Sequence, residues 1–267
     1  ADIFTGSMSV PMNCTGLKRA ICNDAYGELQ NFWWVVRGYY LDHMEEAGID
    51  VDLSVVDCYP LYNQFKIEHK SMVYNVEYVN KISKLCEKYD FSTDRGKVVH
   101  ATHFYLTNRI KYSGIQDQKD TAGFHSLPGG NVLHEDLDEW HNWFMGKDIR
   151  IWNLDFREAL EKVNAMQPKT LNILVYLDPP YVEHGDTYIH KMSEQDHRDL
   201  ADILINELDH DWLLSYDPDP LVYELYDGQA GINIHTTSWQ YSSTNGNLTN
   251  GRKELLITNR NVDVCEL

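Results

Sequence analysis

The most informative segment of the chain is Asn172-Ile173-Leu174-Val175-Tyr176-Leu177-Asp178-Pro179-Pro180-Tyr181, an apolar run that ends abruptly in an acidic residue, two prolines and a tyrosine. An apolar run without polar alternation is typical of a central parallel strand that is buried on both faces. In an open α/β sheet, ligands bind beyond the carboxyl ends of the strands. The segment therefore predicts a parallel strand and places Asp178 to Tyr181 where a functional site belongs.

Outward from this run, the chain alternates between strand and helix patterns. Strands are predicted at 18–22, 149–152, 172–177 and 212–216, and a final strand pair at 231–237 and 254–259. Helical spacing of apolar residues predicts a helix from Leu29 that stops near Gly48, and another that begins around Phe156. A third begins at Ser193, which forms a capping-box pattern with Asp196. Alternating elements of this kind predict an α/β fold with helices on both faces of the sheet.

The middle of the chain, residues 52–146, has a different character. It is rich in Tyr, His, Lys and Asp, and residues 121–131 are loop-like. Because it interrupts the alternation, we expect it to form a mainly helical subdomain inserted into an α/β domain made of 1–51 and 147–267.

Composition narrows the class of protein. The 267 residues carry a net charge of −18, whereas a protein that coats nucleic acid is usually basic. Any contact with DNA must therefore use a local patch. No apolar run approaches the roughly 18 residues of a membrane span. The five cysteines are scattered without a C-x-x-C pair, which favours a reduced, cytoplasmic protein with no disulfide framework and no structural metal.

The four residues after the apolar run have a specific chemical use. Two prolines fix φ and remove two backbone donors, so the turn presents carbonyl oxygens. With the Asp178 carboxylate and the Tyr181 ring, these acceptors can hold a flat heterocycle that bears an exocyclic amine. Acceptors aimed at both N–H bonds favour a pyramidal nitrogen whose lone pair can attack a methyl group in line. Such catalysis is positioning and electrostatics, without a covalent enzyme intermediate.

These residues resemble a known family. Tyr176 to Tyr181 resembles the catalytic motif of the Dam-like alpha group of S-adenosylmethionine-dependent N6-adenine DNA methyltransferases. Residues 2–10 resemble that family's cofactor loop, with Met8 in place of its last glycine. Further resemblance covers Asn23-Asp24, Phe104 to Arg109, Asp155-Phe156, Tyr188, Asp196-His197, Leu213 to Ser215 and Lys253 to Asn259.

The resemblance implies a Rossmann-like methyltransferase sheet, with 1–51 and 147–267 binding S-adenosylmethionine and 52–146 recognising the target. It implies site-specific methyl transfer to a flipped-out adenine in double-stranded DNA. The catalytic residues it implies are Asp178, Pro179, Pro180 and Tyr181. The cofactor-binding residues it implies are Asp2, Phe4, Gly6, Ser7, Asp24, Asp155, Phe156 and Asp178.

Contacts with DNA are expected from two segments. They involve Asn108, Arg109, Lys111, Tyr112, Arg252 and Lys253. The plain alternatives are a helix with core aromatics and a solvated basic side for the first segment, and a simple hairpin for 241–253. Residues 115–126 depart from the family pattern associated with GATC, so no target sequence is assigned.

Several alternatives stay open. The family has a strand and a Lys- and Gly-containing segment before the cofactor loop, whereas this sequence starts within that region, through truncation or a late natural start. An RNA or other base N-methyltransferase of the same fold is one alternative function. A non-catalytic DNA-binding or partner subunit is another. The oligomeric state, with a monomer as the simplest case, and the biological role (restriction partner, phage self-protection or epigenetic mark) are open.

Overall fold

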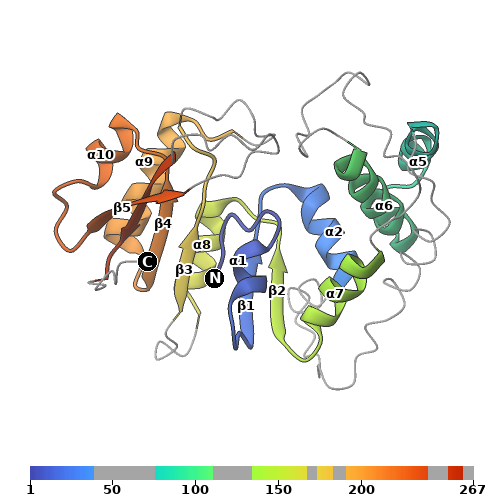
Figure 1. The fold of residues 1–267 in the computed structure, drawn as a ribbon, viewed down its shortest axis with the longest axis horizontal. Helices are drawn as coiled ribbons and strands as arrows, with labels where there is room; N and C mark the ends of the chain where they lie inside the picture. The colour runs from blue at the N-terminus through green and yellow to red at the C-terminus, as the bar shows by residue number, and fades with distance from the viewer. Residues whose placement is uncertain (39–75, 111–133, 167–172, 183–190, 240–251, 261–267) are drawn as a thin grey trace. The chain divides into compact units, whose positions relative to one another are not determined.

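The computed structural model describes residues 1–38, 76–110, 134–166, 173–182, 191–239 and 252–260 and shows a mixed α/β protein (Figure 1). The chain divides into two compact units, residues 1–7 with 154–267 and residues 8–153. The first boundary of the predicted division into 1–51 with 147–267 and 52–146 lies outside the described residues. That division stays a prediction.

In the described residues, the first unit contains four strands in the order β3-β4-β6-β5. They are Leu174–Leu177 (β3), Asp211–Tyr216 (β4), Asn233–Trp239 (β5) and Arg252–Thr258 (β6). β3 pairs with β4 in parallel, while the β4–β6 and β6–β5 pairings are antiparallel. The helices are Phe156–Asn164 (α8), Glu194–Asp202 (α9), the π-helical turn Ile203–Glu207 (η4) and Pro220–Tyr226 (α10). The predicted strand at 212–216 and the final strand pair are confirmed.

β3 has hydrogen-bonded neighbours along both edges. On the edge away from β4, Tyr176 N donates to Ala1 O at 2.7 Å and Ile3 N donates to Tyr176 O at 3.1 Å. Asp2 and Tyr176 form a parallel bridge. The predicted burial of both faces is wrong at the start of the strand, where Leu174 is 53% exposed while Val175 and Leu177 are fully buried. Only the face of β3 that carries Val175 and Leu177 belongs to the core.

The core of the first unit lies between this sheet and its helices. Trp212 and Leu214 are fully buried, and the indole N–H of Trp212 donates to Leu204 O at 2.9 Å. Burial of a large apolar side chain stabilises a fold by about 1.5–3 kcal/mol. The predicted capping box at the start of α9 is confirmed, because the Ser193 side chain accepts from Asp196 N and the Asp196 side chain accepts from Ser193 N.

The second unit contains a parallel strand pair and the helices that pack beside it. β1 (Arg19–Asn23) pairs with β2 (Asp148–Trp152) from Arg19↔Asp148 to Asn23↔Trp152. The helices are Ser9–Asn13 (α1), Gly27–Arg37 (α2), Val76–Lys88 (α5), Asp94–Ile110 (α6) and His134–Phe144 (α7). The described part of 52–146 is thus helical, as predicted, whereas the loop predicted at 121–131 lies outside the described residues.

Aromatic side chains from α2, α6 and α7 fill the core of the second unit. The Phe32 ring stacks on the Tyr105 ring, with centroids 5.8 Å apart and planes at 11°. Trp33 meets Trp140 edge-on at 5.5 Å. Phe104 also belongs to this cluster of buried residues. Trp33, which is 3% exposed, therefore belongs to the core of the second unit.

The predicted helix stop near Gly48 is wrong. α2 ends at Arg37, and Gly38 follows it in the left-handed conformation with φ 87°. Its backbone N–H donates to Trp34 O at 2.9 Å, which closes the last turn. Glycine adopts positive φ without a Cβ penalty, so the nearer glycine ends the helix.

Gly96 in the first turn of α6 provides a test of the packing. A Cβ at this position would lie 1.6 Å from Asp90 O. Gly→Ala in a helix interior normally gains about 0.5–1 kcal/mol. Here the clash with backbone dominates, and we expect Gly96→Ala to lower the free energy of unfolding by about 1–3 kcal/mol. Chemical denaturation measures this change.

The control is Lys84→Ala, at an exposed position on α5. We expect it to leave the free energy of unfolding within about 0.5 kcal/mol. If Gly96→Ala were as stable as this control, the loop before α6 would be able to move aside without cost.

Candidate active site

The four residues after β3 lie at the carboxyl end of that strand, as predicted. Asp178 is exposed, Pro179 is buried, and Pro180 and Tyr181 are half-buried. Since Asp2 pairs with Tyr176 in parallel, the N-terminal segment leaves the sheet at the same end as β3 does. The structure therefore brings the predicted catalytic turn and the start of the predicted cofactor loop to the carboxyl end of β3 in the first unit.

The phenol end of Tyr181 is held by two polar side chains of the sheet. Its hydroxyl lies 3.2 Å from Ser215 Oγ and 3.4 Å from Glu254 Oε1. The Ser215 hydroxyl donates to the same Glu254 oxygen. Ser215 comes from β4 and is fully buried, while Glu254 comes from β6. Because two neighbouring strands fix the hydroxyl, the Tyr181 ring has a defined orientation beside Asp178.

The Asp178 carboxyl has an altered acidity. Desolvation raises its pKa to about 6, and the negative charges of Glu254 and Asp217 act in the same direction. The Tyr181 hydroxyl acts in the opposite direction by hydrogen bonding. The residue keeps an exposed surface while protein atoms crowd its carboxyl. At neutral pH this carboxyl is therefore mostly ionised, and it is a stronger base than an ordinary aspartate.

The predicted cofactor loop contains two left-handed backbone conformations. Gly6 has φ 48°, and a Cβ built on it would meet only Phe4 O, at 4.0 Å. Met8, which stands in place of the glycine in the resemblance, has φ 58° although it is not glycine. Its side chain is fully buried. Ser7 between them is exposed. The backbone at position 8 thus keeps the conformation that glycine favours.

Asp155 and Phe156 lie at the start of α8. Asp155 is the N-cap, and its Oδ1 accepts from Arg157 N at 3.0 Å. The Asp155 side chain is 56% exposed, so it also has access to solvent. The Phe156 ring is buried, and its centroid lies 5.9 Å from that of Phe4. Two aromatic rings and an exposed carboxylate therefore gather at one place in the first unit.

Asp24, in the second unit, follows β1 as predicted. Its backbone N donates to Trp152 O at 3.2 Å, and its Oδ1 accepts from Tyr26 N at 2.9 Å. One oxygen thus serves the turn before α2, which is the ordinary role of an acidic residue after a strand.

The predicted DNA-contacting residues fall into two places. Asn108 is half-buried near the end of α6, and Arg109 lies in the same helix. Phe104 and Tyr105 of that helix are buried, as the plain alternative expected. Arg252 and Lys253 begin β6, where Lys253 is exposed. Lys111, Tyr112 and most of the predicted hairpin lie outside the described residues.

A surface pocket of about 300 Å³ lies in the first unit. Its lining includes Val182, Met192, His197 and Leu221. None of the predicted catalytic residues lines it. His197 is buried, and its Nδ1 lies 2.6 Å from Tyr216 Oη.

Sequence reasoning gave no role to Ser215, Glu254 or Arg157. The first two lie in segments that resemble the family, but pairing in the sheet is needed to bring them to Tyr181. A carboxylate in the otherwise apolar run Glu254-Leu255-Leu256-Ile257 was the available signal. Arg157 follows Asp155-Phe156 directly and carried no signal of its own.

Comparison with known families decides the class of protein. A model of the D12 class N6 adenine-specific DNA methyltransferases matches residues 1–243. The chain belongs to this family. The resemblance seen in the sequence is thereby confirmed. A search of curated proteins finds no match. The methyltransferase transfers a methyl group from S-adenosylmethionine to N6 of adenine in DNA.

The residues of the first unit fit this cofactor. An exposed carboxylate at a helix start can accept from the adenine amine, and the neighbouring ring offers an apolar face. Gly6 leaves space for close backbone approach.

Within the described residues, no helix of the methyltransferase is long and apolar enough to cross a membrane.

The contribution of Glu254 to the acidity of Asp178 can be measured directly. We expect Glu254→Gln to lower the pKa of the Asp178 carboxyl below about 6, because it removes a nearby negative charge and keeps a hydrogen-bonding group. Carboxyl-labelled NMR titration reports this pKa. Glu224→Gln, at an exposed position on α10, serves as the control and leaves it unchanged. An identical Asp178 titration in the Glu254 variant would contradict the expected interaction.

Proposed function

We propose that the methyltransferase acts site-specifically on an adenine flipped out of double-stranded DNA, with Asp178 to Tyr181 as the binding site of that base. The observation that carries this proposal is the position of Asp178, a residue with an exposed surface at the end of β3, beside a Tyr181 held by Ser215 and Glu254. Removing the base from the stack is required because its amine is otherwise enclosed in the duplex.

In this proposal the Asp178 carboxylate and the backbone carbonyl of Pro179 accept the two N6 hydrogens. The Tyr181 ring stacks on the base. These contacts favour a nitrogen whose lone pair points at the electrophilic methyl group that S-adenosylmethionine supplies when bound. A new N–C bond forms as the C–S bond breaks, and S-adenosylhomocysteine leaves. The proton lost from N6 passes to Asp178, which is basic enough to hold it briefly before releasing it to water.

We assign the cofactor to the residues that the resemblance indicates. Asp155 accepts from the adenine amine, and Phe156 packs beside the ring. Asp24 accepts from the ribose hydroxyls. The methionine portion is assigned to the N-terminal loop, namely Asp2, Phe4, Gly6 and Ser7. Asp178 bridges cofactor and target amine.

The proposed architecture is a Rossmann-like sheet with helices on both faces, formed by 1–51 and 147–267, with 52–146 as the target-recognition subdomain. Contacts with DNA are assigned to Asn108, Arg109, Lys111, Tyr112, Arg252 and Lys253. The four basic residues among them, Arg109, Lys111, Arg252 and Lys253, act locally against a net charge of −18. Binding to DNA should consequently weaken steeply with added salt.

The test is transfer of labelled methyl groups to unmethylated plasmid DNA, followed by nucleoside analysis. We expect N6-methyladenine as the product of the unmodified chain. Asp178→Ala should reduce transfer to background, because it removes the acceptor of the target amine, and should leave the thermal unfolding midpoint nearly unchanged.

The matched control is Asp211→Ala, an aspartate at the opposite, amino-terminal end of β4. We expect it to retain full transfer. Turnover by Asp178→Ala at the control rate would refute the catalytic assignment. Transfer to structured RNA in preference to duplex DNA would refute the proposed substrate.

The rate should also depend on pH. Since Asp178 must be ionised to accept from N6 and its pKa is raised to about 6, single-turnover transfer should fall as pH decreases through about 6. The fall approaches about tenfold per pH unit below that value. A rate that stays constant down to about pH 4.5 would exclude the ionised Asp178 as the required form.

A further inference from the structure

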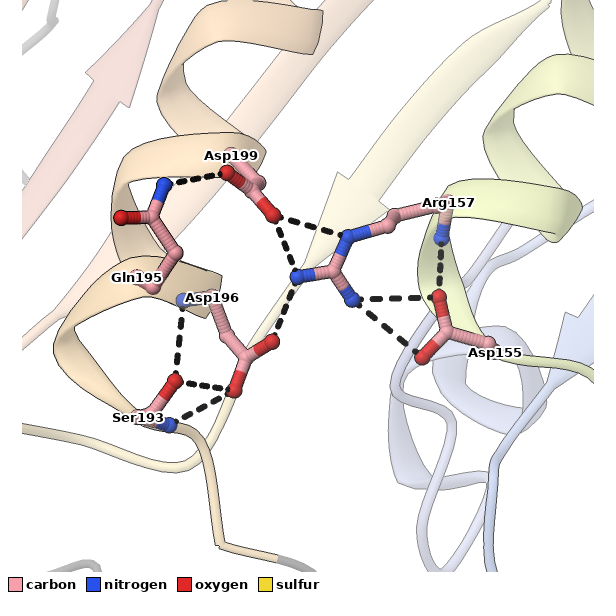
Figure 2. Close-up of polar contacts among 6 residues, drawn as sticks. All are labelled: Asp155, Arg157, Ser193, Gln195, Asp196 and Asp199. Carbon is pink, nitrogen blue, oxygen red and sulfur yellow. Dashed lines mark hydrogen bonds and ion pairs between the residues drawn. The ribbon is translucent and has the colours of Figure 1, made fainter.

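Arg157 connects the start of α8 to the start of α9 (Figure 2). Its Nη2 donates to Asp196 Oδ1 at 2.5 Å and to Asp199 Oδ2 at 2.6 Å, and its Nε donates to Asp199 Oδ2 at 3.0 Å. On the α8 side, its Nη1 lies 3.3 Å from Asp155 Oδ1. One guanidinium therefore joins the N-cap of α8 to two carboxylates of α9.

The same guanidinium covers the ring of Phe156. Its Cζ lies 4.3 Å from the ring centroid, which is a cation–π contact. Phe156 and Asp155 are the two residues that the proposed function assigns to the adenine of the cofactor. Arg157 thus contacts both of them without itself being assigned to the cofactor.

The contacts leave one oxygen of Asp155 weakly engaged. Oδ1 accepts from Arg157 N at 3.0 Å and from Nη1 at 3.3 Å. Oδ2 lies 3.5 Å from Nη1, at the limit of a hydrogen bond. Because the side chain is 56% exposed, Oδ2 has both the access and the lone pairs to accept from an incoming amine.

The α9 end of the network is itself fixed. Asp196 takes part in the capping box with Ser193, and Gln195 donates to Asp199 Oδ1 at 2.7 Å (Figure 2). Burial alone would raise the pKa of Asp196, but hydrogen bonds from Arg157 and Ser193 lower it to about 2. The anchor is therefore charged at every pH at which the enzyme would be assayed.

We propose that Arg157 is a positioning residue for the adenine of S-adenosylmethionine, which holds Asp155 Oδ2 and the Phe156 ring in the binding geometry and anchors both to α9. The inference rests on the proposed cofactor site and adds a residue to it. The alternative is that Arg157 only straps two helices together, in which case its loss would weaken every ligand of the site equally.

Arg198 on α9 offers a matched control. It donates to Glu194 Oε1 at 2.8 Å and to Glu224 Oε1 at 2.9 Å, so it also joins two helices. Its side chain is 35% exposed, compared with 37% for Arg157. Neither Glu194 nor Glu224 is assigned to the cofactor. Arg198→Gln removes a similar ion-pair network without touching Asp155 or Phe156.

The experiment compares two ligands by calorimetry on the full chain. One is S-adenosylhomocysteine, and the other is S-inosylhomocysteine, in which a carbonyl replaces the adenine amine. We expect Arg157→Gln to weaken binding of the adenosyl ligand about tenfold, the size of one hydrogen bond to a charged group. The loss for the inosyl ligand should be much smaller, because that ligand cannot donate to Asp155. Arg198→Gln should bind both as the unmodified chain does.

Equal losses for the two ligands, or no loss for either, would overturn the role of Arg157. Failure of the unmodified chain to bind S-adenosylhomocysteine would instead overturn the proposed cofactor site. Thermal unfolding of each variant shows whether it is folded. If Arg157→Gln does not fold, Arg157→Lys replaces it, because lysine keeps the charge but lacks the planar fork that reaches Asp155 and α9 together.

Discussion

The hydrogen-bond ladder around β3 is the constraint on which the candidate site depends. Ala1 to Ile3 on one edge and β4 on the other hold a strand of only four residues, Leu174–Leu177. Because the pairing is parallel on both edges, the N-terminal segment, β3 and β4 all leave the sheet at the same end. The start of the predicted cofactor loop, the Asp178 turn and Ser215 near the end of β4 therefore lie at the same end of the sheet, although they are far apart in the sequence.

A second feature of this end of the sheet is the negative charge around Asp178. The negative charges of Glu254 and Asp217 act on the Asp178 carboxyl and add to the rise of its pKa that burial causes. A methyl donor with a cationic sulfonium suits such surroundings, whereas the DNA phosphates do not. In the proposed function the two tasks are separate, with carboxylates assigned to the chemistry and a small number of cations, such as the exposed Lys253, assigned to the DNA backbone.

Much of the fold could be predicted because its signals are local. The apolar run before Asp178, the capping pair Ser193 and Asp196, and the helix start at Phe156 each depend on a few neighbouring residues. The helix end was misplaced because the sequence offers two glycines, and the nearer one, Gly38, already adopts the left-handed φ that ends α2. Arg157 and Glu254 were missed for a different reason. Their partners come from other helices and strands, so their roles exist only once the chain is folded.

The left-handed Met8 affects the conformation of the predicted cofactor loop. A side chain in this conformation costs roughly 1–2 kcal/mol relative to glycine, and the fully buried thioether offsets that cost. Methionine also samples fewer backbone states than glycine in the unfolded chain, so less entropy is lost when the loop becomes ordered. Where the resemblance expects glycine, this enzyme has a buried methionine that keeps position 8 in the left-handed conformation.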